Sequence, residues 1–132
     1  MIEFMLDADI CIYLMSKRHP ELNKRAEVAG ETVCISTVAL AELHFGVENS
    51  DPQAANRREL DGFVADLEIV DFDAAAAQHY GDIRAALRRA GTPVGSNDLL
   101  IGAHARSLGL TLVTNNRREF DRMPGLKVEN WV

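Results

Sequence analysis

Three acidic side chains stand in parts of the sequence where a folded protein normally places apolar residues. Asp7 directly follows a short hydrophobic run, Glu42 interrupts an apolar helical pattern, and Asp98 opens another apolar stretch. A buried carboxylate is costly unless it is paired, hydrogen-bonded, protonated or bound to a metal. If the three side chains converge, their mutual repulsion makes a divalent cation the natural way to stabilise them. We therefore predict a hydrolytic metal site.

The sequence offers oxygen ligands for this site rather than sulfur or nitrogen ligands. Cys11 and Cys34 lack metal-binding spacing, and the four histidines are isolated from one another. Carboxylate oxygens favour hard cations, Mg²⁺ or Mn²⁺. Such ions activate water and neutralise charge on a phosphoryl group, so phosphodiester hydrolysis fits better than acyl transfer or redox chemistry. No GxSxG, P-loop or GxGxxG motif is present.

Each acid also has a purely structural interpretation. Asp7 can cap the helix that follows it, Glu42 can pair with an arginine, and Asp98 can be an ordinary helix N-terminal acid. Glu42 is the most informative of the three, because its neighbours on the helix surface are apolar or small. Ser96 and Asn97 are available to cap the helix that contains Asp98, so Asp98 is not needed for that role.

A further ligand is expected after the fourth strand. Asn116 is near enough to the strand end to bind a metal ion or its water, and Glu119 and Asp121 are charged alternatives that the sequence leaves open. Asp9 lies in the first turn of a helix, where the helix dipole favours an acid. We therefore expect Asp9 to have a supporting or structural role.

Apolar runs and turn residues predict strands that alternate with helices. Strands are expected at residues 2–7, 33–35, 68–72, 110–114 and 126–131. Helices are expected at about residues 10–16, 20–29, 37–48, after Pro52, between Asp73 and Gly91, and at 98–107. This alternation predicts an α/β fold with a mostly parallel sheet of about five strands, covered by helices on both faces. Ligands in such folds bind beyond the carboxyl ends of the strands.

Length and composition place the chain among ordinary globular proteins. Its 132 residues, of which 47% are hydrophobic and 26% charged, predict one domain over residues 1–132. No apolar run approaches the roughly 20 residues that a membrane span needs. The first residues also lack the pattern of a secretory signal, because Glu3, Asp7 and Asp9 interrupt them. We expect a cytoplasmic protein.

The basic residues are clustered although the formal net charge is −6. This net charge argues against broad, non-specific adhesion to nucleic acid. Eleven of the 14 basic residues are arginine, which is well suited to forked phosphate contacts. Each cluster can also be a solvated helix face. As RNA-binding candidates we single out Arg84, Arg88, Arg117 and Arg118.

Four segments of this chain resemble the PIN-domain ribonuclease toxins called VapC. They are residues 5–14, 35–43, 95–101 and 112–116, in matching order and spacing. The similarity extends from residue 3 to the C-terminal residues 128–131, and is greatest to the subgroup that cuts the anticodon stem–loop of initiator tRNA.

The resemblance implies a three-layer α/β sandwich and a Mg²⁺-dependent endoribonuclease, the toxin of a type II toxin–antitoxin pair. Asp7 and Asp98 would be the principal metal ligands and Glu42 would complete the acidic cluster. Thr37 and Asn116 would support it. The resemblance also implies a homodimer, neutralised by a small cognate antitoxin that covers the site.

Two features depart from the family pattern. Family members often carry Thr-Asn where this chain has Ala8-Asp9, which adds a negative charge beside the site. Many PIN domains have a fourth acid where Asn116 stands, which leaves open whether one or two ions bind.

The sequence leaves two alternatives to the nuclease function. Asp7-Ala8-Asp9 is also similar to the nucleophile loop of haloacid-dehalogenase-type phosphatases, in which Asp7 would become phosphorylated. Those enzymes need a downstream lysine, and this chain has none between Lys24 and Lys127. The second alternative is a catalytically silent module that only binds RNA or an antitoxin. The presence of all three acids disfavours it.

Overall fold

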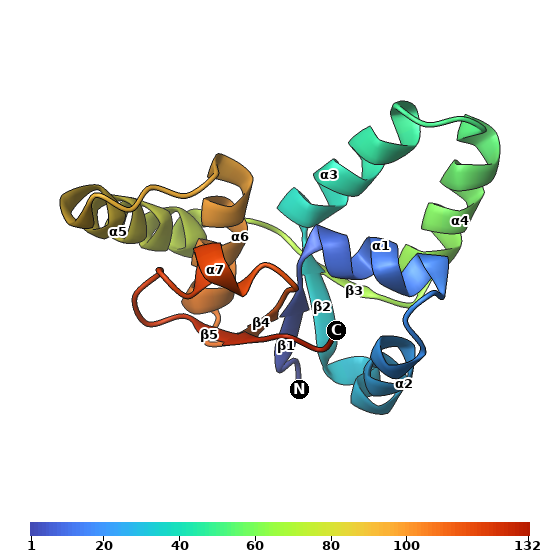
Figure 1. Ribbon diagram of the computed structural model, residues 1–132, viewed down its shortest axis with the longest axis horizontal. Helices are drawn as coiled ribbons and strands as arrows, with labels where there is room; N and C mark the ends of the chain where they lie inside the picture. The colour runs from blue at the N-terminus through green and yellow to red at the C-terminus, as the bar shows by residue number, and fades with distance from the viewer.

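A single parallel sheet of five short strands organises the protein (Figure 1). The computed structural model describes residues 1–132. The strand order is β3-β2-β1-β4-β5, so the first strand lies in the centre, and every neighbouring pair is parallel. The strands are β1 (Phe4–Leu6), β2 (Val33–Ser36), β3 (Glu68–Val70), β4 (Thr111–Val113) and β5 (Lys127–Glu129).

Helices cover both faces of this sheet. The first four lie on one side and the last three on the other, as right-handed crossovers between parallel strands require (Figure 1). This confirms the predicted three-layer α/β fold. No helix combines the length and apolar character needed to cross a membrane. The helices are α1 (Ala8–Ser16), α2 (Pro20–Ala29), α3 (Thr37–Glu48), α4 (Gln53–Ala65), α5 (Ala74–Ala90), α6 (Ser96–Ser107) and α7 (Arg117–Phe120), with a 3₁₀ turn η1 (Gly30–Thr32).

Two strands pass into helices without an intervening loop. Asp7 Oδ1 accepts a hydrogen bond from the Ala8 N–H at 2.8 Å and caps α1. Ser36 Oγ accepts one from the Val38 N–H at 3.0 Å and caps α3. Such caps satisfy N–H groups that a helix start leaves without partners. The polar residues that follow β1 and β2 are therefore fixed at the same edge of the sheet.

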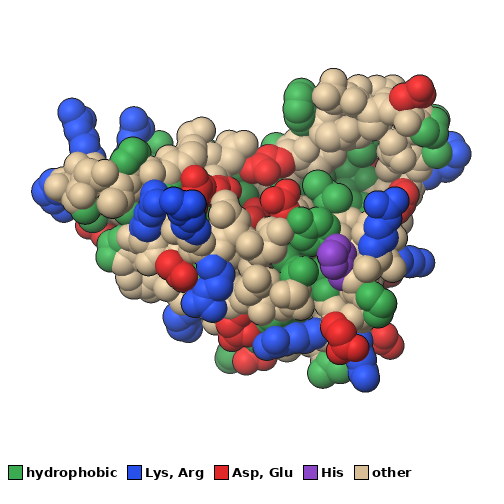
Figure 2. All heavy atoms as spheres, in the orientation of Figure 1, with side chains coloured by type: hydrophobic (Ala, Val, Ile, Leu, Met, Phe, Trp, Pro, Cys, Tyr) green, Lys and Arg blue, Asp and Glu red, His purple; other side chains and the backbone are tan.

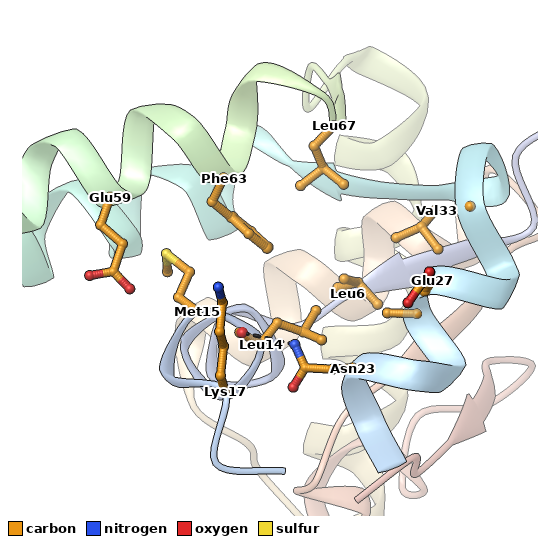
Figure 3. Close-up of a pocket in the computed structure, with 12 residues that line it drawn as sticks. Leu6, Leu14, Met15, Lys17, Asn23, Glu27, Val33, Glu59, Phe63 and Leu67 are labelled. Atoms are coloured by element: carbon orange, nitrogen blue, oxygen red, sulfur yellow. Dashed lines mark hydrogen bonds between the residues drawn. The ribbon is translucent and has the colours of Figure 1, made fainter. Parts of the chain in front are cut away.

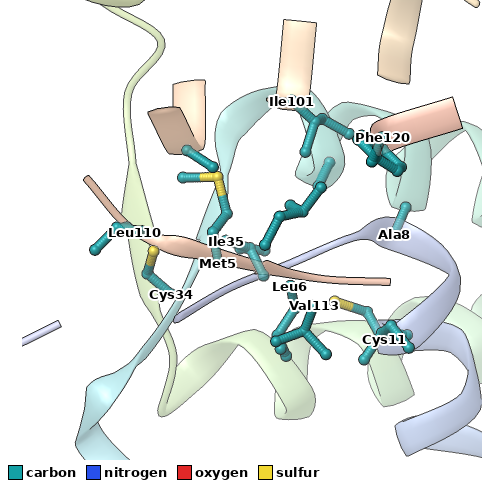
Figure 4. Close-up of a cluster of buried hydrophobic side chains, with 14 of the residues drawn as sticks. Met5, Leu6, Ala8, Cys11, Cys34, Ile35, Ile101, Leu110, Val113 and Phe120 are labelled. Carbon is teal, nitrogen blue, oxygen red and sulfur yellow. The ribbon is translucent and has the colours of Figure 1, made fainter. Parts of the chain in front are cut away.

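The side chains of the central strands divide between two apolar layers. Leu6 and Val113 lie with Cys11 on one side of the strands, and Ile101 and Phe120 lie on the other (Figure 4). All five side chains are buried. Burial on both faces explains why these strands read as continuous hydrophobic runs in the sequence.

The helix boundaries differ from the expected ones near the site. α1 begins at Ala8 rather than at residue 10, because Asp7 caps it directly. α6 begins at Ser96, so Asp98 lies inside its first turn. The short helix α7 was not expected, since one turn of helix is too short to show a hydrophobic period.

α6 packs closely against the segment between α7 and β5 at one glycine. A Cβ atom added to Gly102 would overlap the Met123 sulfur and lie 3.3 Å from Leu126 Cδ2. Met123 is buried and has little room to move. Gly102 therefore allows the helix that carries Asp98 to approach its neighbours.

We predict that Gly102→Ala lowers the free energy of unfolding, by up to about 2 kcal/mol. Overpacking costs about 1–3 kcal/mol, and the better helix propensity of alanine, about 1 kcal/mol, offsets part of it. Gly62→Ala in α4 is the control, because a Cβ there meets nothing within 4 Å. Urea denaturation should show Gly102→Ala less stable and Gly62→Ala at least as stable as wild type. Equal stability of the two variants would contradict this packing.

Candidate active site

The predicted acids come together at the carboxyl edge of the sheet. Asp7 ends β1, Glu42 lies midway along α3, and Asp98 lies in the first turn of α6. Figure 2 shows acidic side chains gathered where α1, α3 and α6 meet. Residues from three separate segments therefore form one negatively charged region.

Asp7 is the most rigidly held of the acids. It is only 4% exposed, and its Oδ2 accepts a hydrogen bond from the Thr114 hydroxyl at 2.9 Å. The same hydroxyl accepts one from the Asn116 N–H at 2.9 Å. Burial raises the pKa of the Asp7 carboxyl, and the hydrogen bonds from Thr114 and Ala8 act in the opposite direction.

Thr114 is a site residue that the sequence reasoning did not assign. It is fully buried after β4, and its hydroxyl joins Asp7 to the segment that carries Asn116. The supporting hydroxyl had been expected at Thr37. Thr37 Oγ1 instead accepts a hydrogen bond from the Phe72 N–H at 3.2 Å and contacts none of the acids through a hydrogen bond.

Asp98 is linked to two candidates from the segment after β4. The Asn116 side-chain amide donates to Asp98 Oδ2 at 3.3 Å. Glu119 lies near enough to Asp98 to raise the pKa of its carboxyl group, through hydrogen bonding and through its charge. Asp121, the third candidate, instead pairs with Arg117 at 3.3 Å. The structure thus brings Asn116 and Glu119 to the acidic region and leaves Asp121 outside it.

Glu42 has a buried oxygen without a partner. Its Oε1 is enclosed by protein and makes no hydrogen bond. Glu42 lines a cavity of about 440 Å³ together with Asp9 and Asn97, and the Asn97 side chain acts to lower the pKa of Glu42. An unpartnered buried carboxylate oxygen is costly, and such a group is commonly satisfied by a bound ion or water.

The carboxyl groups raise one another's affinity for protons. Burial raises the pKa of Asp98 to about 8, with further contributions from the hydrogen bond to Glu119 and the charges of Asp7, Glu119 and Glu42. Burial also raises the pKa of Glu42, and the charges of Asp7 and Asp9 add to it. Asp9 is itself exposed, so it acts on the cluster through its charge. A cation would relieve this repulsion.

A buried histidine anchors the helix that carries Glu42. His104 of α6 is fully buried, and its Nδ1 lies 2.8 Å from the Ser36 hydroxyl that caps α3. Its ring packs edge-on against Phe72 with centroids 5.4 Å apart. Burial lowers the pKa of His104, which keeps the ring neutral. Sequence spacing alone gave no indication of this link between α3 and α6.

The donor atoms fit a hard cation. No three Asp, Glu, His or Cys side chains are arranged to hold one ion by themselves. Mg²⁺ commonly takes one or two carboxylates and fills its other positions with water and substrate phosphate. The orphaned Glu42 Oε1 and the raised pKa values of Asp7 and Asp98 agree with such a site.

The acidic region is distinct from a larger cavity of the protein. That cavity, of about 610 Å³, lies between α1, α2 and α4, where Leu14, Met15 and Phe63 line it (Figure 3). None of Asp7, Glu42 or Asp98 borders it. The candidate site is therefore identified by its carboxylates and not by the volume of a cavity.

The arginine candidates fall into two groups. Arg117 is paired with Asp121, which partly neutralises it. Arg84, Arg88 and Arg118 have no carboxylate within 4.0 Å, since every ion pair of the protein involves other basic residues. Figure 2 shows basic side chains over α5 and α7, beside the acidic region.

Comparison with known proteins agrees with this α/β architecture and its acidic site at the carboxyl edge of a parallel sheet. Residues 4–126 match the PIN domain. The chain is 46% identical over 131 residues, 99% of each protein, to the tRNA(fMet)-specific endonuclease VapC of Shigella flexneri. The chain therefore belongs to the PIN-domain family, among its VapC members.

Solved structures show the same fold. The DNA-bound VapBC structure from Salmonella typhimurium matches with a TM-score of 0.96 and 43% identity, covering 100% of both chains. VapBC-5 of Mycobacterium tuberculosis, a member of the VapBC family of toxin-antitoxin systems, matches with a TM-score of 0.74 and 28% identity over 98% of both chains. The resemblance seen in the sequence is thus confirmed.

The raised pKa of Asp98 predicts a pH-dependent stability in metal-free protein. Because the folded pKa, about 8, exceeds the ordinary 3.8, the folded state binds more protons between these values. The free energy of unfolding therefore falls as pH rises through that window. Asp98→Asn removes this loss, so its melting temperature should exceed that of wild type by an amount that grows from about pH 5 to about pH 8.

Thermal melts in EDTA across this range measure the difference. Asp66→Asn, an exposed change at the end of α4, should follow the wild-type profile. If the difference in melting temperature between Asp98→Asn and wild type stays constant with pH, Asp98 is not protonated in the folded protein.

Thr114→Val should weaken the site, because it leaves Asp7 Oδ2 without its donor and the Asn116 N–H without its acceptor. Unsatisfied buried groups cost about 1–3 kcal/mol. We expect lower thermal stability and a smaller rise in melting temperature on Mg²⁺ addition. Thr114→Ser keeps the hydroxyl and should restore both. If Thr114→Val and Thr114→Ser behave alike, the hydroxyl has no such role.

Proposed function

We propose that this protein is a metal-dependent endoribonuclease that cleaves tRNA, initiator tRNA in particular, and is the toxin of a toxin–antitoxin pair. One observation carries the proposal. At the edge of the sheet, Asp7 and Glu42 lie near enough to Asp98 for their charges to raise its pKa. The chain that carries these acids is 46% identical to a tRNA(fMet)-specific endonuclease. Inhibition of translation would follow from the loss of that tRNA.

Asp7 and Asp98 would be the principal ligands of a Mg²⁺ or Mn²⁺ ion, with Glu42 completing the acidic set. When bound, such an ion supplies an activated water and neutralises charge on the phosphoryl group. The other residues prepare the site. Thr114 fixes the orientation of Asp7, Asn116 donates to Asp98, and Glu119 raises the pKa of Asp98.

The surroundings of Glu42 support a covering partner. Ile12 and Phe45 are 50% and 68% exposed, and both line the cavity that contains Glu42. Exposed apolar side chains beside a functional pocket are typical of a protein interface. We assign this surface to a small cognate antitoxin, as in the VapBC relatives, and expect a homodimer of a single PIN domain, residues 1–132, acting in the cytoplasm.

The decisive variants are Asp7→Asn and Asp98→Asn. Each should abolish cleavage of tRNA in Mg²⁺, because each removes a charge that holds the ion, while the fold is kept. The measurement is incubation with total tRNA, with and without EDTA, followed by mapping of new RNA ends. Asp66→Asn, far from the acidic region in sequence and exposed, should cleave as wild type does. Full cleavage by either site variant would refute the assignment.

A further inference from the structure

A second cavity adjoins the start of α6. It has a volume of about 420 Å³ and lies between α5, the loop at residues 92–95 and α6. Its apolar lining comes from Leu87, Pro93, Val94 and Leu99. Cavities of this size with an apolar lining and a few polar groups are typical of sites for small ligands or single side groups.

Two planar side chains border this cavity. Tyr80 and Arg84 are one helical turn apart on α5, and Arg84 Nη1 donates a hydrogen bond to the Tyr80 hydroxyl at 3.0 Å. The guanidinium lies 5.9 Å from the centre of the Tyr80 ring. This contact holds both groups in place, and each presents a flat surface on which a nucleobase can stack.

The charge of the cavity rim is positive in a protein of net charge −6. Arg84 and Arg88 both line it. Neither has a carboxylate within 4.0 Å, whereas Arg25, Arg57, Arg106 and Arg117 are each paired. The two free guanidinium groups are thus available to neutralise a phosphate.

The cavity also lies next to the proposed catalytic region. Ser96 and Leu99 line it, and they share the first turn of α6 with Asp98. Successive nucleotides of a single strand can therefore reach both places. An occupant of the cavity would be close to the phosphodiester bond at the acids.

From these observations we infer that this cavity binds one unpaired nucleotide of the RNA substrate. The base enters the apolar interior and stacks on Tyr80, and the adjoining phosphate contacts Arg84 and Arg88. This inference rests on the proposed ribonuclease function and adds a site that selects an extruded base. Such a site would favour a target with a structured loop over a duplex, whose bases are stacked and paired.

Binding measurements on the Asp98→Asn protein separate this site from catalysis. Fluorescence anisotropy with the anticodon stem–loop of initiator tRNA is the assay. Tyr80→Ala should weaken binding by about 5-fold to about 100-fold, the value of one stacked base. Tyr80→Phe keeps the ring and loses only the hydrogen bond with Arg84, so it should bind more tightly than Tyr80→Ala. Arg84→Ala should weaken binding and reduce the slope of log affinity against log salt by about 0.7.

Two controls sharpen the test. Arg89→Ala removes an exposed arginine of the same helix that does not line the cavity, and should change the affinity far less than Arg84→Ala. An abasic nucleotide placed at each loop position in turn should weaken binding at one position, and this loss should disappear in the Tyr80→Ala background.

Normal binding by Tyr80→Ala, or abasic effects that persist unchanged in it, would overturn the nucleotide site. Melting temperatures of all variants verify that the fold is kept. Failure of the nucleotide site can be distinguished from failure of the proposed function, because RNA cleavage by the wild-type protein is measured separately. If the wild-type protein cleaves RNA and Tyr80→Ala does not weaken RNA binding, only the nucleotide site is rejected. If the wild-type protein does not cleave RNA, the ribonuclease function is rejected.

Discussion

The central constraint on this structure is the repulsion among carboxylates that are partly or fully removed from water. Asp7, Glu42, Asp98 and Glu119 lie near enough to perturb one another, and the protein does not supply an arginine or lysine to neutralise them. A fold tolerates such a cluster only by protonating it or by binding a cation. Two features agree with this, the raised pKa of Asp98 and an oxygen of Glu42 left without a partner.

The sheet topology explains how distant segments meet. β1 is the central strand of the sheet, and β2 and β4 are its neighbours. The carboxyl ends of these three parallel strands therefore lie side by side at one edge. Side-chain caps at Asp7 and Ser36 start α1 and α3 immediately. Thr114 then joins Asp7 to the segment after β4, and His104 joins Ser36 to α6. The acids are therefore held by a framework of buried hydrogen bonds, which keeps them together despite their repulsion.

Part of this arrangement could be predicted from the sequence and part could not. The three-layer fold followed from alternating apolar runs, and Asp7, Glu42 and Asp98 were identifiable because acids in apolar patterns are costly. Thr114 and His104 could not be found in this way, since a threonine after a strand and an isolated histidine are both ordinary in sequence. α7 was not predicted, because a helix of one turn shows no hydrophobic period in the sequence. The choice among Asn116, Glu119 and Asp121 depended on the fold of the segment after β4. Its helical turn brings Arg117 and Asp121, four residues apart, into an ion pair.

The most direct test is to count the protons released when Mn²⁺ or Mg²⁺ binds. Titration calorimetry near pH 7 in two buffers of different ionisation enthalpy gives this number. With the pKa of Asp98 at about 8, binding should release about one proton per ion near pH 7, about half as many near pH 8 and almost none above about pH 9. Binding with no proton release near pH 7, or no binding of either ion, would contradict the view that a protonated acidic cluster is the metal site.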